Sequence, residues 1–300
     1  MLAEINNLCL AHRAKIEVRF FGHYQSEFDA QILAQIPDVV HLSVDSLRKI
    51  RNVKQISCLK KVCYLSFGVF EFDQPEILEM LPLDRLKQFS ILENRKPNID
   101  LALLTNCKQL DTLYVEGHTK NLEAISSLPG LSKVTLRAIP KSKKIEFLSA
   151  CEKLVDLTLI FGGRQNLADF SHPNLESLSV IWVKGLEDLG PINRFPKLKN
   201  LVVEDQLRLH MIDVSATEIT NLRICNCKNL DQVKGLSDLK NLKVFWIYKT
   251  KLPLEELMEF GWPISLEELG LYSQSQSWNK KFDERSAARG YSNRLQSYFA

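Results

Sequence analysis

The most regular feature of the chain is a spacing of apolar residues that recurs eleven times. Each triplet has an apolar residue, two free positions, a second apolar residue, one free position and a third, as in Leu154, Leu157 and Leu159. The middle residues of successive triplets are 21 to 24 residues apart. These middle residues are Leu42, Leu65, Phe89, Leu113, Val134, Leu157, Leu178, Leu201, Leu222, Phe245 and Leu269. A repeat of this period overrides the two-domain expectation from length and indicates stacked supersecondary units.

The last two apolar residues of each triplet alternate with a free position, which is the period of a β-strand. One unit is too small to bury its apolar side chains alone, so neighbouring units must stack with their strands side by side and parallel. The remaining residues of each unit return the chain along the opposite face. Helical spacing predicts short helices over 76–80, 100–105 and 145–151, and single tight turns over 122–128 and around His172.

The triplet and the residues that follow it resemble the L-x-x-L-x-L-x-x-N-x-L pattern of the leucine-rich repeat superfamily, specifically its short irregular or internalin-like class. The match is fullest over Leu86–Asn94 and Ile219–Leu230. The resemblance implies an α/β fold: a leucine-rich repeat solenoid, or curved horseshoe, with a parallel sheet on the concave face and short helices or turns on the convex face. In the family the asparagine satisfies backbone groups of the turn. Because most repeats here lack it, we expect looser and less uniform turns; the position holds Leu47, Phe70, His118, Ile139, Gly162, Val183, Gln206, Thr250 and Gln274.

The ends of such a stack expose apolar surface and need caps. We predict an N-terminal cap over 1–38, eleven repeats over 39–272, and a C-terminal cap or basic tail over 273–300. In the first segment Ile16, Val18 and Phe20 alternate like an edge strand, and Ser26 with Asp29 matches a capping box at the start of a helix. In the last segment we predict a helix over 283–299; a docking element is the alternative there.

Charge and composition narrow the class of partner. The net charge is +3, from 39 basic and 36 acidic side chains, and residues 273–300 carry all of it. This excess is too weak to indicate a nucleic acid or an anionic membrane surface. No stretch approaches the roughly 20 apolar residues that span a bilayer, and the first residues do not resemble a signal peptide. The seven cysteines have no paired spacing, so we expect reduced thiols and a cytoplasmic location.

The sequence carries no catalytic signature. The segment 161–164, Phe-Gly-Gly-Arg, lacks the glycine spacing and the lysine of a phosphate loop. The six histidines fall in separate units, and Cys225 with Cys227 lacks the second pair that zinc requires. We expect a non-enzymatic protein without cofactor or metal, with Cys107, Cys151 and His172 in the core. The basic runs over 48–51 and 141–144 are expected to face solvent.

The sheet face is formed by the residues just before, just after and three after each middle residue. Charged residues at these 33 positions sum to −2, which disfavours binding along a phosphate backbone. Apolar and aromatic residues take three of fifteen positions in the first five units and seven of eighteen in the last six. Aromatic side chains beside arginine are typical of interface anchors; chance exposure and the strand preference of Trp and Tyr are the alternative explanation. The predicted partner-binding residues are Tyr114, Ile160, Phe161, Ile181, Trp182, Arg223, Trp246, Tyr248 and Tyr272.

We therefore expect a protein–protein interaction module that binds a protein partner on its concave face, mainly through the C-terminal half, and is a monomer when unbound. Three alternatives stay open. One is a bacterial immunity protein that neutralises a toxin by direct binding. The second is a secreted adhesin of the internalin type, which the absence of a recognisable export signal disfavours. The third is a repeat-containing ubiquitin ligase, for which the segment after Leu271 leaves too little chain for a catalytic domain.

Overall fold

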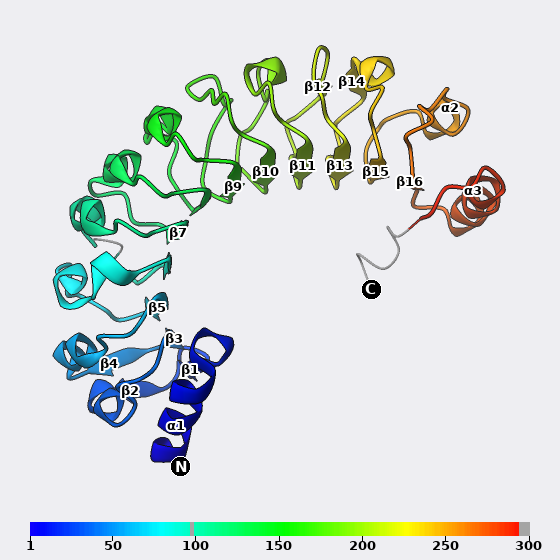
Figure 1. The fold of residues 1–300 in the computed structure, drawn as a ribbon. Helices are drawn as coiled ribbons and strands as arrows, with labels where there is room; N and C mark the ends of the chain where they lie inside the picture. Colours follow the sequence, from blue (N-terminus) through cyan, green and yellow to red (C-terminus); the bar gives the residue numbers. More distant parts are fainter. Residues whose placement is uncertain (97–98, 294–300) are drawn as a thin grey trace. The chain divides into compact units, whose positions relative to one another are not determined.

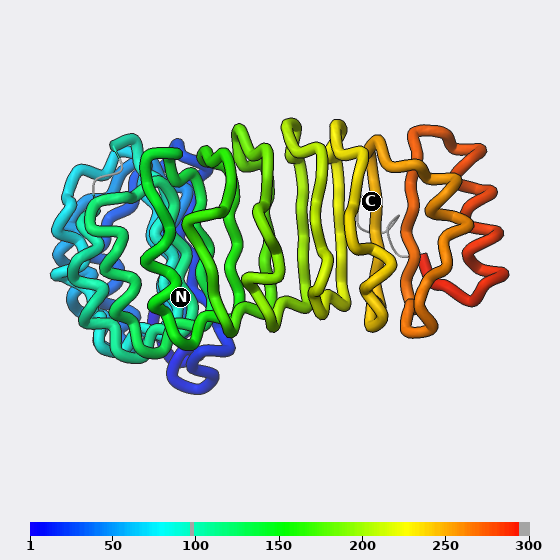
Figure 2. Tube along the Cα trace, turned by 90° about the horizontal axis from the view of Figure 1, so that it is seen from above, coloured from blue at the N-terminus to red at the C-terminus, as the bar shows by residue number. Residues whose placement is uncertain are grey.

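The computed structural model describes residues 1–96 and 99–293, which fall into two units. The first unit comprises Met1–Ile139 and Phe147–Leu154, and the second comprises Pro140–Glu146 and Val155–Ala300. Within each unit the chain forms a stack of similar rungs (Figure 1, Figure 2). The strands line one face of the stack, and short turns and helices line the opposite face (Figure 1).

Each unit contributes six parallel strands to its sheet face. In the first unit they are β1 (Glu17–Phe21), β3 (His41–Leu47), β5 (Tyr64–Val69), β6 (Gln88–Ile91), β7 (Thr112–Glu116) and β8 (Lys133–Arg137). In the second unit they are β9 (Asp156–Ile160), β10 (Ser177–Ile181), β11 (Asn200–Glu204), β13 (Asn221–Cys225), β15 (Val244–Tyr248) and β16 (Glu268–Tyr272). Two small parallel pairs lie beside them: β2 (Glu27–Asp29) with β4 (Lys49–Arg51), and β12 (Met211–Asp213) with β14 (Gln232–Lys234).

The register of the strands confirms the sequence repeat. Middle residues of successive triplets are paired directly, so that Leu178 lies between Leu157 and Leu201. All 33 triplet side chains are buried, and none is more than 6% exposed. Burial of one such side chain contributes about 1.5–3 kcal/mol, and each triplet is buried only against its neighbours in the stack. The predicted leucine-rich repeat solenoid, with its open parallel sheet, is therefore confirmed.

The return segments are tighter than the sequence pattern predicts. The segments expected to be helical at 76–80, 100–105 and 145–151 form 3₁₀ turns, and so does the predicted tight turn near 122–128. The 3₁₀ helices are Arg13–Lys15, Ala30–Gln35, Val53–Cys58, Ile77–Met80, Leu83–Arg85, Leu101–Asn106, Leu122–Ser127, Glu146–Ala150, Ile192–Arg194 and Leu236–Asp238. A 3₁₀ helix rises about 2.0 Å per residue against 1.5 Å in an α-helix. A 3₁₀ helix therefore spans the same return path with fewer residues than an α-helix would need, which suits a unit of only 21 to 24 residues.

The two ends of the described chain carry the α-helices. The predicted edge strand is confirmed as β1, which pairs with β3. Helix α1 (Leu2–His12), which the sequence analysis did not predict, precedes it. The predicted capping box is wrong: the helix begins at Ala30, and Asp29 caps it by accepting a hydrogen bond from the Gln31 N–H at 3.0 Å.

At the other end, α2 (Leu254–Met258) precedes β16, and α3 (Gln276–Ala288) follows it. The predicted helix over 283–299 is wrong in its bounds, because Ser275 caps the helix eight residues earlier and the chain turns at Gly290. Phe282, on α3, is 1% exposed. Residues 294–299 of the predicted helix lie outside the described residues.

The position where the family pattern has asparagine holds Asn94 in one rung and other hydrogen-bonding side chains in three more. Asn94 donates from its amide to the Phe72 carbonyl at 2.9 Å. His118, which is fully buried, is bound through Nε2 to the Leu92 carbonyl at 3.1 Å and accepts a hydrogen bond from the Ile99 N–H at Nδ1. Gln206 and Cys227, also fully buried, donate to strand carbonyls in the same way. Different side chains at this position therefore bind backbone carbonyls of the preceding rung, although not the same carbonyl in each case.

Candidate functional site

The predicted binding residues of the second unit lie mostly in two adjacent rows that cross its strands. The first row holds the last residue of each strand, and these residues pair in register: Ile160, Ile181, Glu204, Cys225, Tyr248 and Tyr272. The second row holds the next residue of the first five rungs: Phe161, Trp182, Asp205, Asn226 and Lys249. Since parallel strands are about 4.8 Å apart, the first row is about 24 Å long. Eight predicted residues are thus on one sheet face or its edge.

Within this surface, an aromatic cluster occupies the last three strands. It consists of Cys225, Val244, Trp246, Tyr248 and Tyr272. The Arg223 guanidinium lies over the Trp246 ring at 4.2 Å. Because Gly270 is the register partner of Trp246 on the other side, no side chain there displaces the indole.

The exposure of the cluster differs from residue to residue. Trp246 is only 5% exposed, so its neighbours cover it and it supports them from below. Tyr248 and Tyr272 are half-buried, with their rings 6.0 Å apart and edge to face. The Lys249 ammonium lies 4.8 Å from the centre of the Tyr248 ring. Tyr248 and Tyr272 are therefore the aromatic side chains that this cluster presents to solvent.

Phe161 and Trp182 occupy a left-handed turn position that recurs in the repeat. Each directly follows a strand and has a positive φ, 57° for Phe161 and 48° for Trp182. Their N–H groups donate to the last strand residue of the next rung, to the Ile181 carbonyl at 3.0 Å and to the Glu204 carbonyl at 2.9 Å. The left-handed region disfavours bulky side chains by about 1–2 kcal/mol, and Gly117 and Asn226 take the same position in other rungs. Ser46, Ala138, Asp205 and Lys249 also have a positive φ at this position, so the conformation belongs to the turn of the repeat in general.

These two rings contribute to a hollow at the edge of the sheet, which we call the rim hollow. Its volume is about 730 Å³. The rings of Phe161 and Trp182 are 5.4 Å apart, and Trp182 and Leu207 are each 56% exposed. The full lining is Lys141, Phe161, Gly162, Gly163, Trp182, Val183, Lys184, Gly185, Asp205, Leu207 and Arg208. The rim hollow therefore combines an apolar floor with three basic side chains and one acidic one.

The sheet face beside the rim hollow has the opposite charge. Among the sheet-face positions of the second unit, three are acidic, Asp156, Glu204 and Glu268, and one is basic, Arg223, for a sum of −2. Burial, followed by the nearby charge of Asp205, raises the pKa of Glu204. The second unit thus presents an acidic sheet and a basic edge within one surface.

Tyr114 is the predicted residue that lies in the first unit. It is half-buried on β7, and its hydroxyl donates to a Glu116 carboxylate oxygen at 3.4 Å. Burial, and to a smaller extent the Glu116 charge, raises its pKa to about 12. Glu116 also forms an ion pair with Arg137 at 2.7 Å. Tyr114 therefore belongs to a local polar network of the first unit.

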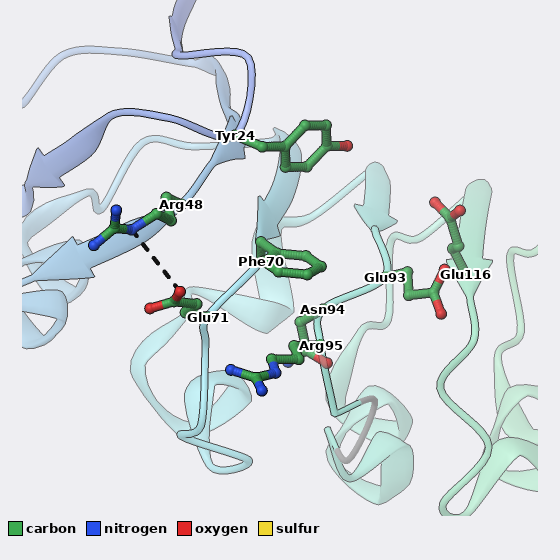
Figure 3. A pocket seen from close by; sticks show the side chains of 8 residues that line it. All are labelled: Tyr24, Arg48, Phe70, Glu71, Glu93, Asn94, Arg95 and Glu116. Carbon is green, nitrogen blue, oxygen red and sulfur yellow. Dashed lines mark ion pairs between the residues drawn. The ribbon is translucent and has the colours of Figure 1, made fainter.

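A second hollow, of about 500 Å³, lies in the first unit (Figure 3). The exposed rings of Tyr24 and Phe70 lie on one side of it, 6.2 Å apart, and the carboxylates of Glu93 and Glu116 lie on the other (Figure 3). Arg48 is paired with Glu71 at 3.8 Å along its edge (Figure 3). The lining is Tyr24, Arg48, Phe70, Glu71, Glu93, Asn94, Arg95 and Glu116. Basic and acidic side chains both line this hollow. Its lining therefore does not favour ligands of one charge as clearly as the lining of the rim hollow does.

The cysteines and histidines lie where packing explains them. Burial raises the pKa values of the Cys225 and Cys227 thiols to about 12, which disfavours the nucleophilic thiolate. Cys107 and Cys151 are buried, as predicted, and His172 accepts a hydrogen bond from the Asn174 N–H at 3.2 Å. Within residues 1–96 and 99–293, no group of three or more His, Cys, Asp or Glu side chains is placed to hold a metal ion.

Part of this surface comes from residues that the repeat pattern does not predict. Leu207, Lys184 and Arg208 lie outside the repeat framework, and Lys141 belongs to a basic run that was expected to face solvent. Trp182 lies one residue beyond the end of its strand, and this position was the signal in the sequence that the sheet edge belongs to the candidate surface.

No helix in the described part of the chain has both the length and the apolar composition for a bilayer crossing.

Comparison with known proteins gives structural matches only. No family model matches the sequence, and no curated protein matches it. An internalin (inlF) from Listeria monocytogenes is similar at 16% identity and a TM-score of 0.49, over 91% of this chain and 95% of the internalin. Toll in the Toll–Spatzle complex of Drosophila matches at 15% identity and a TM-score of 0.48, over 85% of this chain and 39% of the other. The leucine-rich repeat domain of the type III effector XopL matches at 17% identity and a TM-score of 0.43, over 82% of this chain and 79% of that domain.

Proposed function

We propose that this leucine-rich repeat chain is a protein-binding module, and that its contact surface lies on the sheet face and sheet edge of the second unit. The proposal rests on the two adjacent rows of residues that cross the strands of the second unit. Tyr248 and Tyr272 lie toward one end of these rows, and Phe161 and Trp182 lie toward the other. Side chains on this face lie away from the core formed by the triplets, so the need for a core does not explain them. Aromatic anchors supported by neighbours are typical of interface centres.

The scaffold suits binding by a preformed surface. Each strand is held by its neighbours in register across the unit. Trp246, with Arg223 over its ring, supports the half-buried tyrosines from below. A partner would therefore order few side chains of this chain when it binds, which lowers the entropic cost of association. The acidic sum of the sheet face disfavours a nucleic acid along the strands.

The thiols support a further part of the proposal, a reducing compartment such as the cytoplasm. All seven cysteines are free, and five of them are buried. Structural disulfides are common in oxidising compartments and rare in the cytosol. A chain whose cysteines serve as core residues fits the second setting.

The test is affinity capture from a lysate of the source cells, followed by measurement of the dissociation constant for the partner identified. Tyr248→Ala and Tyr272→Ala should each weaken binding about thirtyfold, the equivalent of a 2 kcal/mol interface anchor. Tyr64→Ala, a matched tyrosine on β5 of the first unit, should change it less than about threefold. Equal effects of all three substitutions, or none, would contradict the proposal.

A further inference from the structure

The rim hollow of the second unit has features that a general sheet-face contact does not require. Its apolar floor comes from three successive rungs through Phe161, Trp182 and Leu207. Within the described part of the second unit, Trp182 and Leu207 are two of the three large apolar side chains that are strongly exposed; Ile264 is the third. Two such side chains in one concave site, with a third ring against them, form a pocket for an apolar side chain of a ligand.

The charges around this floor are one-sided. Lys141, Lys184 and Arg208 line the hollow, and Asp205 is the one acidic residue in the lining, for a sum of +2. Asp205 accepts a hydrogen bond from the Asn226 amide, and Arg208 is paired with Glu187 at 3.4 Å. Among the described residues, the side chains of Lys141 and Lys184 have no ion pair, and both are exposed. The hollow therefore offers two ammonium groups, without an ion pair in the described part of the chain, beside an apolar floor; the Lys141 charge also helps to lower the pKa of Glu187, after the larger effects of Gln165 and Arg208.

The walls of the hollow are held rigidly. The Lys184 N–H donates to the Gly162 carbonyl at 3.3 Å, and the Arg164 N–H donates back to the Lys184 carbonyl at 3.1 Å. The Arg164 side chain is 11% exposed and binds Asp169 at 3.1 Å and the Lys143 carbonyl at 3.0 Å. These bonds connect the Gly162–Gly163 loop to the segment that carries Lys141. The backbone segments that carry the basic side chains and the apolar floor thus keep their relative positions before a ligand arrives.

We propose that the rim hollow binds an acidic peptide segment of a partner protein, with an aromatic or leucine side chain on the Phe161–Trp182–Leu207 floor and flanking Asp or Glu side chains at Lys141 and Lys184. This deepens the proposed function and rests on it. A concave site favours an inserted side chain over a flat lipid surface, and the acidic sheet beside it repels a nucleic acid that would extend along the strands. Charge complementarity therefore selects an acidic protein segment.

The experiment selects a displayed random peptide library against the full chain and then measures binding of the selected peptides by fluorescence anisotropy. Enriched peptides should carry an aromatic residue or leucine flanked by Asp and Glu, and their affinity should fall as salt is raised. Lys184→Glu should weaken them at least tenfold, whereas Lys251→Glu, the same charge change at an exposed position outside the hollow, should change affinity less than twofold.

Trp182→Asn separates binding from folding. Asparagine tolerates the left-handed conformation better than tryptophan and already takes this position in another rung as Asn226. The variant should keep its circular dichroism spectrum and thermal midpoint. Its affinity for the selected peptides should fall at least tenfold.

Four results would overturn the inference. The first two are selected peptides that show no enrichment of acidic residues, and unchanged peptide affinity in Trp182→Asn and Lys184→Glu. The other two are tighter binding of phosphatidylserine vesicles or oligonucleotides than of the peptides, and self-association of the chain that Trp182→Asn abolishes. If the peptides fail while Tyr248→Ala still weakens the captured partner, this inference is wrong and the proposed function stands. If Tyr248→Ala has no effect either, both fail.

Discussion

His118 allows a sharp test of how this solenoid satisfies its turns. The ring is fully buried; Nε2 donates to the Leu92 carbonyl at 3.1 Å, and Nδ1 accepts from the Ile99 N–H at 3.2 Å. A neutral ring fits both bonds, whereas a protonated ring would direct an N–H at the Ile99 N–H. Burial lowers the pKa of His118 from its ordinary value of 6.5, and the bond to Leu92 only partly opposes this effect. Acidification should therefore destabilise the folded chain.

The sign and the size follow from proton linkage. A base whose pKa is lowered on folding binds protons more readily in the unfolded chain, so stability is complete above about pH 6.5 and falls below it. The upper bound of the loss at pH 5, for a folded ring that took up no proton at all, is RT ln(1 + 10^1.5), about 2 kcal/mol, and any proton uptake by the folded ring makes the loss smaller. The depressed carboxylate pKa values, such as that of Asp100, affect stability mainly at lower pH.

The assay compares the wild-type chain with His118→Asn by urea unfolding at pH 7.5 and pH 5. Asparagine takes the equivalent place in the preceding rung, where Asn94 donates to the Phe72 carbonyl. The wild-type chain should lose up to about 2 kcal/mol more than the variant between the two pH values. Carboxylates and other histidines contribute equally to both chains and cancel in the comparison. Identical pH dependences would refute the assignment of a neutral, structurally required His118.

Three further predictions concern stability and thiol reactivity. Leu201→Ala should lower the free energy of unfolding by about 2–5 kcal/mol because Leu201 is fully buried, whereas Val202→Ala on the sheet face should cost less than about 1 kcal/mol, as measured by urea unfolding. Asp100→Ala should cost about 1 kcal/mol at neutral pH through loss of a cap. Because the folded pKa of Asp100 is lowered from 3.8 to about 2, this difference should disappear as the pH falls through that interval. Cys225 and Cys227, with pKa values near 12, should react with iodoacetamide at pH 8 only after unfolding, and mass spectrometry of the labelled peptides measures this; rapid labelling of the folded chain would contradict it.

The sequence by itself determined the architecture of the stack. An apolar triplet at a fixed offset buries its side chains only if each strand lies beside the next in register, so the spacing alone predicts the pairing of Leu157, Leu178 and Leu201. The same spacing determines which residues face away from the core. Tyr248 and Tyr272 were therefore placed correctly on the sheet face from the sequence.

Only the tertiary structure decided which of those residues are accessible and what surrounds them. Trp246 lies on the same face but is covered, because Arg223 lies over its ring and Cys225, Tyr248 of its own strand and Tyr272 of the next strand pack around it. The rim hollow depends on return segments whose course no short-range pattern specifies, and it brings Lys141 to a floor formed by rungs far along the chain. Strand period is a local property of the backbone, whereas exposure and charge clustering arise from neighbours that only stacking brings together.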